Sequence, residues 1–101
     1  MELESIKGYL DADGRITQIP SKRKKKIYVL SYLADSIPVG QEFTEMEFNE
    51  LLNDLHTFGD AATLRREMYN YFLVNRNQNG SLYTVNKHRL SAEELIEKYC
   101  W

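Results

Sequence analysis

The chain has 101 residues, 43 % of them apolar, which suits a single domain with one hydrophobic core. Its apolar runs are too short to cross a bilayer and its start is no signal peptide, so we expect a cytoplasmic protein without membrane association. One cysteine, Cys100, excludes an internal disulfide, and the net charge of −2 argues against non-specific nucleic-acid binding.

Residues 11–43 predict a turn, a short strand, a helix and a short extended piece. Gly14 can supply the positive φ of the turn, and residues 16–19 alternate as a strand does. Ser21 is a typical N-cap for the helix that follows, and Pro38 with Gly40 ends it. The apolar stripe of this helix has helical spacing and consists of Ile27, Leu30, Leu33 and Ala34.

Residues 44–72 predict two helices in close succession. Thr44 and Glu47 fit a capping box, with an apolar face after them. Gly59 is a natural helix-ending residue, and Asp60 can cap a helix from residue 61 to about residue 72. Since only Gly59 and Asp60 would separate the helices, we expect them to cross sharply, as in a helix-turn-helix. The apolar face of the first helix consists of Phe48, Leu51, Leu52 and Leu55.

Residues 73–99 predict a β-hairpin and a last helix. The polar turn at residues 77–80 contains Asn-Gly and separates two extended stretches, while Ser91 and Glu94 form a second capping box. The complete order is helix, short strand, helix-turn-helix and hairpin wing, with an extra N-terminal segment and a C-terminal helix. It predicts an α+β fold, a single winged-helix-like domain over residues 1–101.

Charge is distributed unevenly along the chain. Residues 1–34 contain seven basic and four acidic residues, residues 35–60 contain seven acidic residues and no basic one, and residues 61–90 contain five basic and one acidic. A fold that separates these segments presents a positive and a negative face, and such fields steer charged partners.

The helix predicted from residue 61 has an apolar side and a polar side. In a helix-turn-helix the second helix enters the major groove, where arginine can read guanine and asparagine can read adenine. An ordinary solvated face explains the same residue types equally well. The apolar side consists of Ala61, Leu64, Met68, Tyr71 and Phe72. The candidate nucleic-acid-binding residues are Thr63, Arg66, Tyr69 and Asn70 on the opposite side, with Arg65 at its margin.

Five cations follow one another at the start of the first helix: Lys22, Arg23, Lys24, Lys25 and Lys26. Cations cost a few tenths of a kcal/mol each at the positive end of a helix dipole, so a chain that keeps them there can be using them for phosphate binding. A solvated charge run is the alternative. Arg76, in the hairpin, is a further candidate for contact with a phosphate backbone.

The helix predicted after Thr44 argues the other way, because its outer side carries Glu45, Glu47, Glu50 and Asp54. DNA would repel this face, so it must point away from any bound duplex or meet a basic protein partner.

No catalytic or metal-binding pattern is found in the sequence. His56 and His88 lie far apart and neither belongs to a ligand-spaced motif, and there is no phosphate loop or nucleophile elbow. We therefore expect neither an enzyme nor a bound cofactor or metal ion. His56 is interpreted as a helix cap or a half-buried aromatic residue.

Two stretches carry a family resemblance. Residues 10–26, LDADGRITQIPSKRKKK, and residues 60–67, DAATLRRE, followed by Tyr71 and a hairpin, resemble a prokaryotic family known as domain of unknown function 2087. The resemblance covers about residues 9–84. Such domains occur alone or attached to winged-helix transcriptional regulators of the arsenical-repressor type. It implies a regulatory context, and the absent metal-binding motifs of those regulators mean that metal sensing does not carry over.

Two functions remain open from the sequence. The first is a non-catalytic DNA-binding or transcription-regulation domain whose partner is double-stranded DNA. The alternative is a protein-interaction or dimerisation module on the same scaffold, in which Tyr9, the acidic helix and the Cys100–Trp101 end would matter more.

Overall fold

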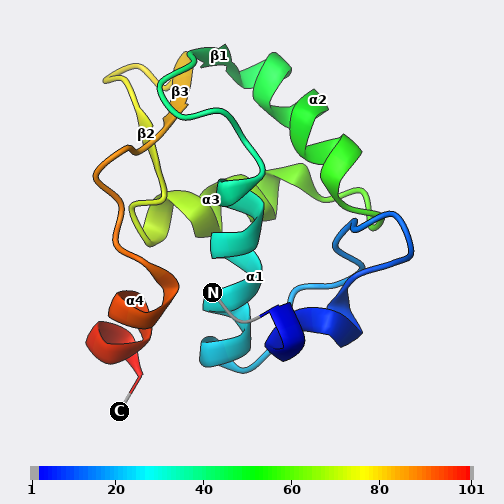
Figure 1. Ribbon diagram of the computed structural model, residues 1–101. Coiled ribbons are helices and arrows are strands. Elements are labelled where there is room, and N and C mark those ends of the chain that lie inside the picture. The colour runs from blue at the N-terminus through cyan, green and yellow to red at the C-terminus, as the bar shows by residue number, and fades with distance from the viewer. Residues whose placement is uncertain (1–2, 101) are drawn as a thin grey trace.

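The computed structural model describes residues 3–100, which form four α-helices, one 3₁₀ helix and a three-stranded antiparallel sheet (Figure 1). The α+β class is confirmed, and from α1 onward the elements follow the predicted order of helix, short strand, two helices, hairpin and last helix. No helix among these residues is long and apolar enough to cross a membrane. The elements are η1 (Leu3–Tyr9), α1 (Arg23–Asp35), β1 (Phe43–Thr44), α2 (Glu45–Leu55), α3 (Ala61–Asn70), β2 (Val74–Arg76), β3 (Leu82–Val85) and α4 (Ala92–Tyr99).

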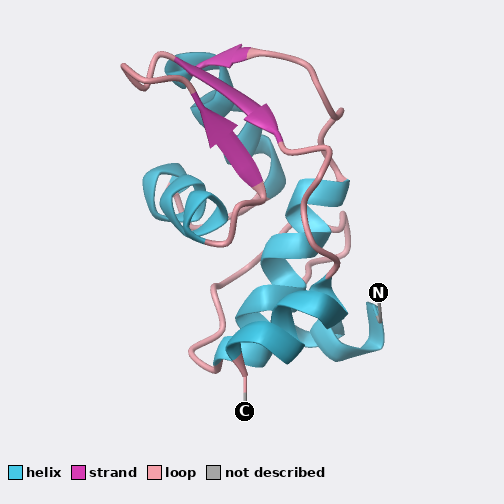
Figure 2. Ribbon diagram, turned by 90° about the vertical axis from the view of Figure 1, so that its left-hand side faces the viewer, coloured by secondary structure: helices cyan, strands magenta, loops and turns pink. Residues whose placement is uncertain are grey.

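Helix α1 is the centre of the molecule, and η1, α3 and α4 all pack against it. Its residues from Ile27 to Leu30 are consecutively buried, so its middle is enclosed on most of its circumference. The sheet has the order β1-β3-β2, and its hairpin lies above α3 in the two views (Figures 1 and 2). One hydrophobic cluster joins the helices to the inner face of the sheet.

Three of the predicted helix starts are confirmed. The Thr44 hydroxyl accepts from the Glu47 amide at 3.1 Å, and the Glu47 carboxylate accepts from the Thr44 amide at 2.8 Å. Ser91 and Glu94 form the same reciprocal pair at the start of α4. Asp60 caps α3 by accepting from the Thr63 amide at 3.2 Å. Each cap satisfies amides that have no partner within the helix.

The start of α1 differs from the prediction. Ser21 is not the N-cap. Lys22 is the N-cap, because its carbonyl accepts the first helical hydrogen bond, from the Lys26 amide. Lys22 is extended, and its side chain makes no capping hydrogen bond. The strand predicted over residues 16–19 is also wrong. Only Ile16 pairs, in isolated bridges to Leu10 and His56, after the predicted turn at Gly14 with its φ of 80°.

The connection between α2 and α3 is longer than predicted. Helix α2 ends at Leu55, so five residues, 56–60, separate the helices instead of two. His56 turns extended, bridges to Ile16, and is buried with 3 % of its surface exposed. Its Nδ1 donates to the Leu52 carbonyl at 2.6 Å and its Nε2 accepts from the Asp60 amide at 2.9 Å, so the ring ties the end of α2 to the cap of α3.

Helix α3 ends at Asn70, earlier than predicted, and Phe72 is not on its buried side. The Phe72 amide bonds to the Tyr69 carbonyl at 3.0 Å and the Leu73 amide to the Met68 carbonyl at 2.9 Å, the pattern of a Schellman C-cap. Phe72 has a φ of 59° and is 60 % exposed, whereas Leu73 turns inward and is buried. A left-handed residue with a side chain costs about 1 kcal/mol relative to glycine.

Candidate nucleic-acid interface

The outer side of α3 is exposed, as its polar pattern predicted. Arg66, Tyr69 and Asn70 are exposed, and Thr63 is partly exposed beside the Asp60 cap. Arg66 forms no ion pair with any residue in the range 3–100. The hydrogen bonds of Thr63 hold the pKa of the Asp60 carboxyl below its usual value, and the positive charge of Arg66 adds to this effect.

Arg65 has a different environment from its neighbour. Its side chain is 17 % exposed, donates to the side-chain oxygen of Asn49, and lies 3.2 Å from the Glu45 carboxylate. Its guanidinium carbon lies 5.5 Å from the ring centroid of Tyr83. Arg65 therefore braces α3 against the start of α2 and against β3.

Arg76 reaches toward α3. The register of the hairpin pairs Arg76 with Tyr83, so both side chains lie on the same face of the sheet. The Arg76 guanidinium carbon lies 4.6 Å from the ring centroid of Tyr69 on α3. The hydroxyl groups of Tyr83 and Tyr69 raise the pKa of Arg76 above its usual value.

These contacts create a small hollow between α3 and the hairpin, which we call the arginine pocket. Its volume is about 220 Å³. Four of its residues were predicted as separate nucleic-acid contacts, but their convergence and the part of Tyr83 were missed. The signal was present in the hairpin register, which fixes Tyr83 opposite Arg76 once the turn is placed. The pocket is lined by Ala62, Arg65, Arg66, Tyr69, Arg76 and Tyr83.

The cations at residues 22–26, which we call the lysine run, are divided among several surroundings. Arg23 donates to the Tyr99 carbonyl at 3.0 Å, at the end of α4. The Lys26 ammonium lies 3.3 Å from the Glu67 carboxylate of α3, with both side chains mostly buried. Lys22 and Lys24 are exposed, and Lys25 is partly buried. The Lys26–Glu67 pair brings the start of α1 to the flank of α3.

The acidic residues of α2 also have different tasks. Glu47 completes the capping box and Glu45 pairs with Arg65, so the start of α2 borders the arginine pocket. Glu50 and Asp54 remain exposed. The Glu45–Arg65 pair therefore joins the acidic helix α2 to α3.

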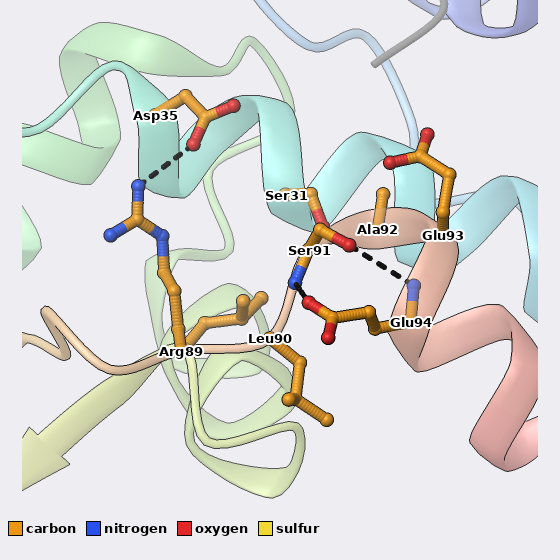
Figure 3. A pocket seen from close by; sticks show the side chains of 9 residues that line it. Ser31, Asp35, Arg89, Leu90, Ser91, Ala92, Glu93 and Glu94 are labelled. Atoms are coloured by element: carbon orange, nitrogen blue, oxygen red, sulfur yellow. Dashed lines mark hydrogen bonds and ion pairs between the residues drawn. The ribbon is translucent and has the colours of Figure 1, made fainter.

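A second pocket, of about 370 Å³, lies between α1 and α4 (Figure 3). Arg89 pairs with Asp35 at 2.9 Å, and the Ser91–Glu94 capping box forms another part of its wall. Ser31 on α1 is 94 % buried, since 6 % of its surface is exposed, and its hydroxyl has no hydrogen-bond partner in the described part of the chain. Asp35, Glu93 and Glu94 outnumber Arg89, so this pocket disfavours anions.

Among residues 3–100, no three histidine, cysteine, aspartate or glutamate side chains are grouped so that they could hold a metal ion. Tyr9 and Cys100, which the interaction hypothesis named, are partly buried, and Tyr9 packs against the core. Trp101 lies outside the described residues.

A family model described as "Uncharacterized protein conserved in bacteria (DUF2087)" matches residues 15–85. The chain belongs to this family. The DUF2087 region extends from the turn before α1 through β3, so it contains the arginine pocket and the lysine run, while η1 and α4 lie outside it. Searches of curated proteins and of solved structures found no match.

Proposed function

We propose that this DUF2087 chain is a non-catalytic winged-helix domain that binds double-stranded DNA in transcription regulation. The observation that carries the proposal is the group of exposed polar residues on α3 (Arg66, Tyr69 and Asn70) with Arg76 of the hairpin beside them. The sheet order β1-β3-β2, with the hairpin directly after α3, supports the assignment of the hairpin as the wing. The attachment to arsenical-repressor-type regulators stays a prediction from the resemblance.

In this proposal α3 is the recognition helix and enters the major groove. Asn70 and Thr63 are exposed or partly exposed and carry groups that can hydrogen-bond base edges. Each good bidentate contact to a base contributes about 1–3 kcal/mol of discrimination against the wrong base. Arg66 and Arg76 supply positive charge next to these positions.

The charges of the neighbouring elements restrict how a duplex approaches. The exposed carboxylates of Glu50 and Asp54 on α2 repel phosphates, so the duplex lies toward the hairpin and the start of α1. Lys22 and Lys24 are exposed at that start, and Lys26 joins it to α3. This orientation would use Lys22 and Lys24 at the start of α1, Arg66 of α3 and Arg76 of β2.

A fluorescence-polarisation titration with a random duplex tests the proposal. Proteins that neutralise about four phosphates lose about 150-fold in affinity between about 50 and about 200 mM salt. We expect binding at the lower salt with a loss of this order. A dissociation constant near 1 mM or weaker at the lower salt would contradict the proposal.

The alternative, a protein-interaction or dimerisation module, is favoured by one observation. Phe72 and Met46 are large apolar residues that are 60 % and 72 % exposed, so most of each side chain is available for contact with a partner. A sedimentation mass of twice the 11.9 kDa chain, without duplex binding, would support this function instead.

A further inference from the structure

The arginine pocket gathers cationic and aromatic side chains from three separate elements. Arg65, Arg66 and Tyr69 come from α3, Arg76 from β2 and Tyr83 from β3. Tyr83 also belongs to the hydrophobic cluster and Arg65 braces α3, whereas Arg66, Tyr69 and Arg76 lie outside that cluster, so the core does not explain why these three gather here.

Two of the three guanidinium groups are already oriented. Arg65 is held by Asn49 and Glu45, and Arg76 is held over the ring of Tyr69 and beside the hydroxyl of Tyr83. A side chain that is fixed before binding loses little conformational entropy when a ligand arrives. Arg66 is exposed and has no ion pair within residues 3–100, so it can move onto a ligand from the open side.

The charge of the pocket is unbalanced. In the described part of the chain Glu45 pairs with Arg65 and the charge of Arg66 acts on Asp60, so the three guanidinium groups exceed these two carboxylates. The tyrosine hydroxyls can donate further hydrogen bonds to an anion. A group with several acceptor oxygens and up to two negative charges fits this set of donors, and arginine forks match the geometry of phosphate oxygens.

The size of the pocket limits what it can hold. Pockets for drug-sized ligands measure about 300–1,000 Å³, and the arginine pocket measures about 220 Å³. It therefore suits a head group whose remainder extends into solvent.

We propose that the arginine pocket binds one phosphate group, delivered either by a free phosphate monoester or by the backbone of a duplex. Arg66 and Arg76 donate to its oxygens, and Arg65 contributes charge from the rear wall. The site uses residues of the proposed DNA-binding surface, yet it does not depend on DNA binding, because a free ester can fill it alone.

The pocket between α1 and α4 provides a contrast within the same molecule. Its one arginine, Arg89, is paired with Asp35, and the side chains of Glu93 and Glu94 add negative charge (Figure 3). Arg89 is therefore the matched control for an arginine substitution that should leave anion binding unchanged.

The test is an NMR titration of the full chain with inorganic phosphate and with phenyl phosphate, following backbone amides and arginine Nε–H signals. We expect shifts at Arg66, Arg76 and Tyr69, and a loss of affinity of about tenfold in each of Arg66→Gln and Arg76→Gln, since hydrogen bonds to charged groups are strong. Arg89→Gln should keep the wild-type affinity. Unperturbed spectra of the variants away from the pocket verify folding. Shifts centred elsewhere, or an equal loss in Arg89→Gln, overturn the proposal.

A second arm identifies the source of the phosphate. A short duplex that displaces phenyl phosphate from the wild type supports a backbone phosphate, and failure to displace it supports a free monoester. If phosphate binds and the duplex does not, this inference stands and the proposed DNA function is wrong. If the duplex binds while neither phosphate probe shifts Arg66 or Arg76, the inference is wrong and the DNA function stands.

Discussion

The lysine run at the start of α1 and the arginine pocket between α3 and the hairpin are both cationic, yet the fold uses their charges differently. In the lysine run, the Tyr99 carbonyl accepts from Arg23 and Glu67 pairs with Lys26, while Lys22 and Lys24 are exposed. In the arginine pocket, residues from distant positions converge on one hollow. A consecutive run of cations spreads around a helix, whereas residues brought together by tertiary structure can share a ligand.

The comparison predicts that duplex binding depends more strongly on the arginines of the arginine pocket than on the exposed lysines of the lysine run. The largest expected effect is on duplex binding. The double variant Arg66→Ala/Arg76→Ala should weaken it about 100-fold, because each residue contributes hydrogen bonds to a charged group. The matched variant Lys22→Ala/Lys24→Ala should weaken it only about fivefold, by losing screened surface charge. Polarisation titrations at one salt concentration measure both, and equal losses would remove the distinction.

The two adjacent arginines of α3 should separate in stability. Arg65→Ala should lower the free energy of unfolding by about 1–2 kcal/mol, because the mostly buried guanidinium bonds to Asn49 and pairs with Glu45. Arg66→Ala should change it by less than about 0.5 kcal/mol, as exposed substitutions usually do. Urea denaturation at neutral pH measures both. A destabilising Arg66→Ala would show that Arg66 also braces the fold.

The ion pair between the two regions should contribute less. A double-mutant cycle with Lys26→Ala and Glu67→Ala should give a coupling energy of about 0.5–1 kcal/mol, since both side chains are about three-quarters buried but remain in contact with water. Glu67→Gln alone should strengthen duplex binding slightly by releasing Lys26. If Glu67→Gln weakens duplex binding, Lys26 stabilises the fold through its ion pair and does not contact the duplex.

The smallest expected effect is on pH dependence. Hydrogen bonds from Thr63 lower the pKa of Asp60, and those from Ser91 lower the pKa of Glu94. Because the folded pKa values lie below those of the unfolded chain, these groups stabilise the fold fully above the ordinary values of 3.8 and 4.5. That contribution is lost as pH falls through the lowered folded values. Asp60→Asn should therefore flatten the acid limb of a stability curve, and an unchanged limb would contradict this.

Local chemistry allowed much of the fold to be predicted. The caps at Thr44, Asp60 and Ser91 depend on a hydroxyl or carboxylate at the right spacing, which a sequence displays directly. The errors occurred where distant segments meet. Residues 16–19 do not form a strand because Ile16 alone finds partners, and α2 stops early because His56 bridges to Ile16. Ile16 and His56 lie 40 positions apart, so the spacing of residues within either segment does not predict this bridge.

The candidate site follows the same rule. The polar side of α3 and the Arg76–Tyr83 pair of the hairpin could be predicted because both depend on local spacing, but the pocket could not, since it forms only where the hairpin brings Arg76 to Tyr69 of α3. Periodicity places Arg66 on the polar side and Arg65 at its margin. The packing of α2 against α3 is what makes Arg65 a brace and leaves Arg66 open.

The left-handed Phe72 has a consequence for how this protein could be altered. Replacing it with glycine would relieve the backbone without opening a cavity, because most of the ring is in solvent. Phe72→Gly should therefore raise the temperature at which the protein unfolds. Thermal stability and an exposed aromatic ring are therefore alternatives at position 72, and Phe72→Gly is a starting point for a more stable variant.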